Sequence, residues 1–240
     1  MKPKEIINKT GEKIHHKNSL FFLESIQKAN RVIQNAKDLD QMMRDILNLV
    51  LEVLKCDRAW LAYPCNPQAK TWTIPMERTV PEWPGFGLKT DQEVPMNPGV
   101  QMIFKQLLDS KGPVIYGKKD WETAIPESIK KYGAKSQIAL AIYPKIGGAW
   151  AFGIHQCSHE RTWTKQEIDI FGEISFLING ALNNLLLVKK LQESESDLKE
   201  KITELERVNK LMIGRELRMI ELKKELEERL NNSEKLNKQT

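Results

Sequence analysis

Cysteine, histidine and long apolar runs are scarce in this chain of 240 residues, and each scarcity excludes a class of protein. The three cysteines are an odd number without a repeated spacing, which argues against a disulfide framework and favours a reducing compartment. The first twenty residues lack an apolar stretch of signal-peptide length, and no run approaches the roughly 18 to 20 apolar residues of a membrane span. We therefore expect a soluble, cytoplasmic protein without a membrane span.

The positive charge is concentrated at one end of the sequence. The net charge is +5, and residues 1–37 carry eight Lys and Arg against three Glu, so the remainder is neutral overall. A basic end of this kind can contact nucleic acid or an anionic surface, but a solvated terminus is the commoner structure. We predict a basic, flexible segment over residues 1–19 and no nucleic-acid partner.

The order of the predicted elements indicates an α+β domain with an antiparallel sheet. Apolar residues recur at three and four from Leu20 to Leu54, which predicts one long helix or two helices broken near Asp38. Thr164 and Glu167 form a capping box that begins a helix reaching about residue 236. Between these helices we predict strands over 59–65, 71–77, 113–116, 136–144 and 148–157, helices over 98–110 and 126–132, and an irregular loop over 80–98.

The last two strands form a hairpin whose alternation separates two faces. Successive residues of a strand point to opposite sides, so Trp150, Phe152 and Ile154 share the face that packs on the long helices. The second face combines small residues with a few polar groups, as ligand pockets do. Its predicted ligand-binding residues are Gln137, Ala139, Ala141, Tyr143, Ala151, Gly153, His155 and Cys157, together with Trp83 and Phe86 from the loop over 80–98.

The loop over 80–98 leaves two alternatives open for this second face. It forms a lid over a bound ligand, or it packs Trp83, Pro84 and Phe86 onto the small residues and leaves no cavity. The cysteines are also open to two interpretations, as redox-sensing thiols or as buried, inert side chains.

The stretch GIHQCSHE (153–160) invites a metal or catalytic interpretation, which its strand geometry disfavours. His155 and Cys157 share a face about 6.5 to 7 Å apart along a strand, whereas His159 lies beyond the strand and is exposed. Neighbours on one strand point in parallel, which makes a catalytic thiol–imidazole pair unfavourable. Structural zinc needs four convergent ligands, and Cys56 and Cys65 are too far apart to supply a close pair. We expect neither catalysis nor a structural metal.

The segments CDRAWLAYPCNP (56–67) and GAWAFGIHQCSHERTWTKQEIDIFGEI (148–174) resemble those of GAF domains, the small-molecule sensory modules of signalling proteins. The resemblance covers residues 20–188 and implies a six-stranded antiparallel sheet with flanking helices and a ligand enclosed by loops. Some GAF domains bind haem, which leaves open a gas or redox sensor with His155 as axial ligand. A bilin is disfavoured, because PESIKKYGAKS (126–136) lacks the Cys-His pair of phytochrome-like GAF domains.

A heptad pattern marks the C-terminal segment, residues 189–240. Its seam positions are Leu191, Leu198, Leu205, Met212, Met219 and Leu226. This pattern predicts a parallel homodimeric coiled coil over residues 189–236, with a change of phase between Leu205 and Met212. The segment also resembles the connecting helices of histidine kinases. No histidine follows His159, so we expect this helix to accept no phosphoryl group and the chain to phosphorylate nothing.

These observations predict a non-catalytic small-ligand or redox sensor that passes a pocket signal to a dimeric coiled coil. The expected downstream partner is a signalling protein such as a histidine kinase or a regulator. Two alternatives remain: the haem-binding sensor and a scaffold protein with an empty GAF core.

Overall fold

The structure is a computed structural model that describes residues 3–35, 38–86, 92–117, 126–130 and 132–237. The chain divides into two compact units, Met1–Leu187 and Val188–Thr240, which are described separately. The first unit contains the sheet and the helices that cover it. The described part of the second unit is the continuation of a single helix.

Two helices precede the sheet, α1 (Pro3–Asn35) and α2 (Leu39–Leu54). The break between them falls where the apolar pattern predicted it. Asp38 has an extended backbone, and its carboxylate accepts a hydrogen bond from the Gln41 amide at 2.7 Å, so it is the N-cap of α2. We predicted a flexible segment over residues 1–19. In the structure the helical backbone of α1 already begins at Pro3.

The sheet is antiparallel and has the strand order β3-β2-β1-β6-β5-β4. The predicted hairpin is confirmed, since β5 pairs with β6 and Ile142 lies opposite Trp150. The sequence missed only the short β3, whose two residues lie inside the predicted irregular loop. The strands are β1 (Arg58–Tyr63), β2 (Thr71–Thr79), β3 (Val94–Pro95), β4 (Val114–Tyr116), β5 (Ser136–Ile142) and β6 (Trp150–Gln156).

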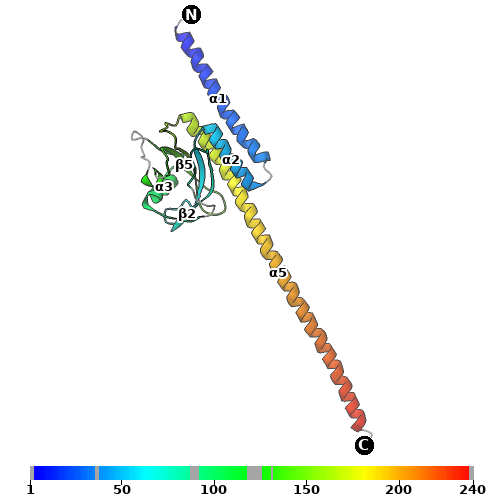
Figure 1. Cartoon of the computed structure of the whole chain (residues 1–240). Coiled ribbons are helices and arrows are strands. Elements are labelled where there is room, and N and C mark those ends of the chain that lie inside the picture. Colours follow the sequence, from blue (N-terminus) through cyan, green and yellow to red (C-terminus); the bar gives the residue numbers. More distant parts are fainter. Residues whose placement is uncertain (1–2, 36–37, 87–91, 118–125, 131, 238–240) are drawn as a thin grey trace. The chain divides into compact units, whose positions relative to one another are not determined.

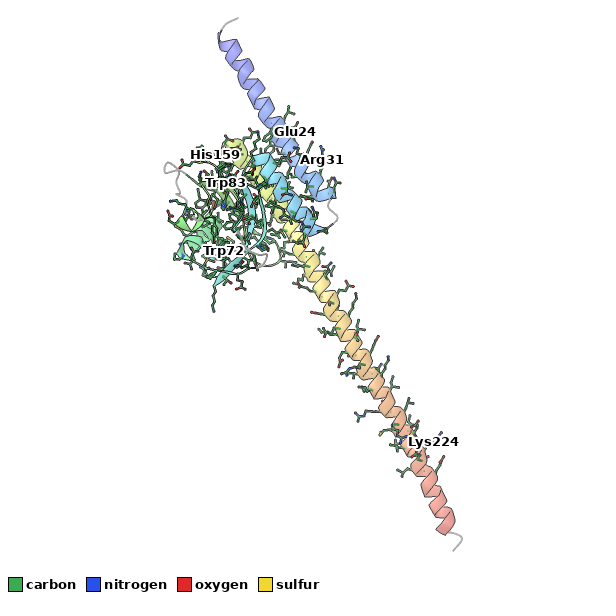
Figure 2. The ribbon with its side chains drawn as sticks, viewed as in Figure 1. Glu24, Arg31, Trp72, Trp83, His159 and Lys224 are labelled. Carbon is green, nitrogen blue, oxygen red and sulfur yellow. The ribbon has the colours of Figure 1, made fainter. Side chains whose placement is uncertain are left out.

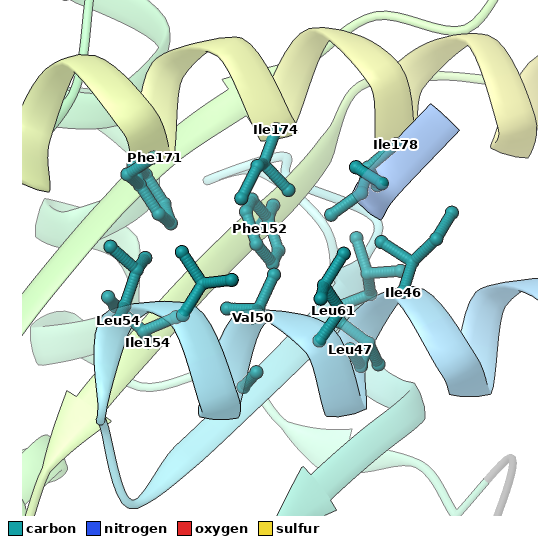
Figure 3. Packing of buried hydrophobic residues seen from close by; sticks show 14 of the residues in the cluster. Ile46, Leu47, Val50, Leu54, Leu61, Phe152, Ile154, Phe171, Ile174 and Ile178 are labelled. Atoms are coloured by element: carbon teal, nitrogen blue, oxygen red, sulfur yellow. The ribbon is translucent and has the colours of Figure 1, made fainter. Parts of the chain in front are cut away.

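The first face of the sheet packs against α2 and the beginning of α5 (Lys165–Asn237). Phe152 is fully buried and stacks on Phe171 with 4.8 Å between the ring centroids. Figure 3 shows Ile174 and Ile178 of α5 above Phe152, with Val50 of α2 below it. The predicted orientation of the hairpin is confirmed, because this core contains Ile138, Ile142, Trp150, Phe152 and Ile154.

The second face is covered by α3 (Pro98–Asp109), α4 (Glu127–Lys130) and the segments around them. Figure 1 shows α3 on the side of the sheet away from α2. Asn97 caps α3 by accepting a hydrogen bond from the Val100 amide at 3.1 Å, and Pro98 follows, as the sequence predicted. A separate apolar cluster forms here, with Phe104 and Leu107 of α3 packed toward the sheet.

The capping box predicted at the start of α5 is confirmed. The Glu167 amide donates to Thr164 Oγ1 at 3.3 Å, and the Thr164 amide donates to Glu167 Oε2 at 2.8 Å. In the second unit, every side chain from Val188 to Glu228 is exposed, including Lys224, labelled in Figure 2. Large apolar side chains are exposed there as well, among them Leu191, Leu198, Ile202, Leu205, Val208, Met212, Met219, Leu222 and Leu226.

One stretch within Lys165–Glu228 is long and apolar enough to cross a membrane by length and composition. Its 18-residue window has a mean hydropathy of 1.3, and 39% of that window is buried inside the structure. A core helix of a soluble protein passes the same test, so the finding is weak evidence for a span. The absence of a membrane span stays a prediction.

Candidate functional site: a buried polar row on the second face of the sheet

Three polar residues form a row across the second face, near one end of three neighbouring strands. In the strand register, Arg58 of β1 lies opposite His155 of β6, and His155 lies opposite Gln137 of β5. None of the three is more than 2% exposed. A charged guanidinium is rarely buried this deeply unless its surroundings are arranged to receive it. We refer to Arg58, His155 and Gln137 as the polar row.

His155 lies between two hydrogen-bond donors and one acceptor. Arg58 Nη1 lies 3.2 Å from His155 Nδ1, and Trp60 Nε1 donates to His155 Nε2 at 3.1 Å. Gln137 Oε1 is 2.8 Å from the same Nε2 atom. Burial, together with the positive charge of Arg58, holds the pKa of His155 well below 6.5, so the imidazole is neutral.

Two aromatic side chains cover the polar row. The Trp60 indole lies across Gly153, where a Cβ atom would collide with the ring, so glycine is required at this point of β6. Phe86 is also buried, and its ring packs edge-on to that of Trp60, with 6.3 Å between the ring centroids. The ring centroids of Trp60 and Phe86 lie 5.5 and 5.6 Å from that of His155.

The segment that carries Phe86 is held by a partly buried ion pair and by hydrogen bonds to both of its members. Arg58 Nη2 donates to the Pro84 carbonyl oxygen at 2.6 Å, and the Phe86 amide donates to both carboxylate oxygens of Glu77 at 3.1 Å. Arg58 Nε lies 3.4 Å from Glu77 Oε1. A Cβ atom at Gly85 would run into the Glu77 carboxylate, so a larger residue there would displace that side chain. We call residues 84–86 the latch.

The predicted small residues lie on the second face of the sheet, where they pack against apolar side chains. Ala139 and Ala151 are buried in the second-face cluster, with Ala141 partly buried against it. The loop over 80–98 was expected either to cover a ligand or to pack onto these small residues. In its described part, Phe86 packs onto them. Trp83 is half-buried instead, and its ring lies 5.9 Å from Lys135 Nζ; Figure 2 labels its position.

Tyr143 and Cys157 do not join the polar row, because both lie one residue beyond the end of their strands. Tyr143 is 56% exposed and lines a surface cleft of about 400 Å³ with residues of α1 and α5 such as Ile33 and Phe176. Cys157 is buried, and its amide donates to Asp57 Oδ2 at 2.6 Å. The prediction that these two side chains bind a ligand together with His155 stays a prediction.

The three cysteines are buried free thiols. Burial raises the pKa of Cys56 and of Cys65 to about 12, and it also raises the pKa of Cys157. Only the thiolate is strongly nucleophilic, so the arrangement favours inert thiols over redox-active ones. Among the described residues, no three His, Cys, Asp or Glu side chains converge as metal ligands.

The surroundings of His155 do not fit an axial haem ligand. Both ring nitrogens lie within hydrogen-bond distance of protein groups, and the ring is fully buried beneath Trp60 and Phe86. An axial ligand needs one free nitrogen that faces an open slot beside it. Haem binding would therefore require both the hydrogen bonds and the aromatic packing to be rearranged.

A second polar cluster fixes the end of β6. Asp57 Oδ2 accepts hydrogen bonds from Gln156 Nε2 at 2.7 Å, from the Ser158 amide at 2.7 Å and from Ser158 Oγ at 2.9 Å, in addition to the Cys157 amide. Asp57 directly precedes Arg58 of the polar row. The exit of the last strand is thus joined to the start of the first strand by a single carboxylate.

Arg161 joins three elements where β6 leads into α5. Its guanidinium donates to the Lys55 carbonyl oxygen at the end of α2 at 2.8 Å and to Gln156 Oε1 at 2.7 Å. It also donates to Glu167 Oε1 in the first turn of α5 at 2.6 Å. The guanidinium carbon lies 4.1 Å from the centroid of the Trp163 ring. The beginning of α5 is therefore tied to β6 and to α2 by one side chain, and His159 remains exposed as predicted.

The six-stranded antiparallel sheet, with two helices on one face and a short helix with loops on the other, defines the GAF fold. No family model matches the chain. One similar structure is a phycoerythrobilin-bound GAF domain from a cyanobacterial phytochrome. The alignment covers 71% of this chain and 99% of that domain, with a TM-score of 0.53 and 15% identity. Another is the chromophore-binding domain of the Stigmatella aurantiaca bacteriophytochrome. The alignment covers 69% of this chain and 60% of that domain, with a TM-score of 0.50 and 13% identity.

Among curated proteins, the chain is similar to the methanogenesis regulatory histidine kinase FilI of Methanothrix harundinacea (strain 6Ac). The two are 26% identical over 182 residues, which is 72% of this chain. The match covers 20% of the kinase, so the chain spans only about a fifth of that relative. The solved structures share the fold of this chain.

Proposed function

We propose that the chain is a non-catalytic sensory module of signal transduction, in which a change on the second face of the sheet is passed to a C-terminal coiled coil. The observation that carries this proposal is the junction at Arg161. One side chain there contacts the last strand, the end of α2 and the first turn of α5. The likeness to GAF domains of phytochromes and to a histidine kinase supports a signalling role.

The proposed signal starts at the polar row and follows the strand that holds His155. From His155, the chain leaves β6 after Gln156 and reaches Cys157, whose amide donates to Asp57, and then Arg161. A displacement of β6 therefore moves the contact between Arg161 and Glu167 at the first turn of α5. The helix α5 is continuous from Lys165, so its start and the heptad segment belong to one element. This is a two-state relay of the kind that allostery requires.

The exposed apolar side chains between residues 189 and 228 support homodimerisation through a coiled coil. Leu191, Leu198 and Leu205 are 67%, 56% and 68% exposed in a single chain. A leucine at every seventh position is stabilised when it packs into a partner helix. The downstream partner in this proposal is a histidine kinase or a regulator, and the proposed location is the cytoplasm.

The dimer is tested by sedimentation of the full chain. Replacing Leu198 and Leu205 by Lys places charge in the seam and is expected to give monomers at micromolar concentration, because buried lysines are costly. The matched control replaces Leu217 and Ile220 by Lys. These two side chains are similarly exposed but lie off the seam, so this variant is expected to remain a dimer. A monomeric wild-type protein, or a dimeric seam variant, would contradict dimerisation through the coiled coil.

The relay is tested with the disulfide that a Leu198→Cys substitution can form between two chains. The native cysteines are buried, so the background of cross-linking is low. Adding Phe86→Ala, which loosens the latch, is expected to change the rate of cross-linking. Phe104→Ala, a cavity of the same size on the same face, should leave the rate near that of Leu198→Cys alone.

A scaffold with a closed core is the competing function, and the packing of Phe86 over the polar row favours it. In a scaffold the coiled coil alone matters. Cross-linking that responds to neither cavity would support the scaffold and reject the sensor.

A further inference from the structure

The polar row contains more hydrogen-bond donors than acceptors. Arg58 Nε and Gln137 Nε2 are fully buried and have no hydrogen-bond partner within the described part of the chain. The His155 imidazole is neutral and can accept at only one nitrogen, although Arg58 and Trp60 direct N–H groups at both. Turning the Gln137 amide over does not remove the conflict, because the imidazole would then face three donors. Such a cluster lacks an acceptor with several lone pairs.

Glu77 supplies part of this missing negative charge, but its geometry is poor. Its nearest oxygen is 3.4 Å from Arg58 Nε, which is longer than a charge-assisted hydrogen bond of about 2.7 to 2.9 Å. The carboxylate is occupied instead by the Phe86 amide. Burial raises the pKa of Glu77, which shows that its charged form is not well stabilised in this position. Arg58 therefore donates to the carbonyl oxygens of Tyr132 and Pro84, but its ion pair with Glu77 is poorly formed.

The latch fills the space above the row with an aromatic ring. Phe86 lies 5.0 Å from the guanidinium carbon of Arg58 and packs against Trp60 and Trp72. An apolar ring and a carboxylate, both supplied by the protein, thus occupy neighbouring positions at the polar row. Removal of the ring would leave an apolar space with donors at one end, which is the chemistry of a site for an organic anion.

We propose that the polar row binds the carboxylate of a small organic acid with an apolar body, which displaces Phe86 and takes the place of Glu77 beside Arg58. A carboxylate fits because its two oxygens accept from a guanidinium in a forked geometry. Gln137 Nε2 is a further donor to the same group. The proposal rests on the sensory function above and names the class of ligand: displacement of the latch is the event that β6 and Arg161 transmit.

Binding is tested by calorimetry on the full chain, with 3-phenylpropionate as the acid and 3-phenylpropan-1-ol as the neutral probe of similar shape. Phe86→Ala removes the ring that the ligand must displace, so it is expected to bind the acid more tightly than wild type. It should also bind the acid about tenfold or more tightly than the alcohol, because a hydrogen bond to a charged group is involved. Glu77→Gln added to Phe86→Ala should tighten acid binding further, since a competing charge is removed.

Phe104→Ala is the matched control, because it opens a cavity of equal size on the same face without exposing Arg58; it should bind neither probe better than wild type does. Equal binding of acid and alcohol by folded Phe86→Ala protein, checked by circular dichroism, would overturn the proposal, as would no binding of the acid. Displacement of the acid by an equal concentration of inorganic phosphate would overturn the assignment to a carboxylate. Binding is measured without reference to cross-linking, so the ligand class and the relay can fail separately.

Discussion

The two faces of one sheet are built from different chemistry, although the same strands form both. On the first face, Phe152 and Ile154 are buried against α2 and α5 among apolar neighbours. The orphaned polar atoms described there are indole N–H groups, those of Trp150 and Trp163. The second face buries a full positive charge, and Arg58 has a donor without an acceptor. An unsatisfied buried group costs more when it is charged than when it is a neutral N–H, so the second face is the weaker of the two.

This difference teaches where a rearrangement is cheapest. Local opening occurs where few favourable contacts are lost, and strained or unsatisfied groups concentrate at functional sites. Removing Phe86 from its position would let water or a ligand reach the orphaned donors of the polar row. Removing an equivalent side chain from the first face would expose only apolar surface. The first face therefore holds the fold together, and the second face is suited to change.

The largest expected effect separates the two faces by stability. Phe152→Ala leaves a cavity in the first-face core and is expected to lower the free energy of unfolding by about 3 to 5 kcal/mol. Phe86→Ala should cost less than half as much, because water that enters can hydrate the buried donors. Urea unfolding of both variants measures this, and equal losses would remove the distinction between the faces.

Two glycines sharpen the comparison at the next level. Gly153→Ala places a methyl group against the Trp60 indole and should destabilise the fold by about 1 to 3 kcal/mol. Gly172 lies in α5, where an added Cβ atom meets no neighbour, so Gly172→Ala should stabilise by about 0.5 to 1 kcal/mol. Thermal unfolding of the two variants should give shifts of opposite sign, and a neutral Gly153→Ala would show that Trp60 is free to move.

The junction between β6 and α5 is expected to contribute less. Arg161→Lys keeps the charge but cannot span Lys55, Gln156 and Glu167 together, so it should cost about 1 kcal/mol. Arg207→Lys is the control, because Arg207 pairs only with Glu204 on an exposed helix face. Chemical unfolding that gives the same value for both would argue against a special role of Arg161.

The smallest expected effect is a pH dependence that arises at the polar row. Burial, with Arg58 nearby, lowers the pKa of His155 well below 6.5 in the folded chain. The unfolded chain takes up a proton at this residue as the pH falls through about 6.5, so the fold loses stability below that pH and keeps it above. His155→Gln cannot take up a proton, so it should lose less stability than wild type between about pH 7 and pH 5.

The control for this prediction is His159→Gln, at an exposed histidine that should leave the slope of wild type unchanged. Glu77 faces the same row through Arg58 and acts in the opposite sense, because its raised pKa removes stability as the pH rises. Only the difference between variants therefore isolates His155. Parallel curves for wild type and His155→Gln would contradict a buried, neutral imidazole.

Most of the fold follows from local signals that the sequence carries plainly. The break at Asp38, the helix predicted over 98–110 and the hairpin of the last two strands depend on neighbours in the chain, and each lies where it was predicted. The alternation of β6 was sufficient to assign Phe152 to one face and His155 to the other. The two-residue β3 gave no such signal, because it is too short to show a period.

The candidate site was predicted on its β5 and β6 side and at Phe86, but not on β1 or β2. Arg58 and Trp60 meet His155 across 97 and 95 residues of sequence, and only the pairing of β1 with β6 brings them together. One signal was available: an arginine that alternates with Trp60 and Ala62 in an apolar strand has to point into the same face. Glu77 gave no comparable signal, since its role depends on where the latch folds back.

The most direct test of the account is amide hydrogen exchange at Phe86 compared with Phe171. The Phe86 amide is bonded to Glu77 in the latch, whereas Phe171 lies in the first-face core of α5. If the second face opens locally, the Phe86 amide should exchange at least about a hundredfold faster than the Phe171 amide, after correction for intrinsic rates. Equal protection of the two amides would mean that the latch opens only when the whole domain unfolds, and it would contradict the account.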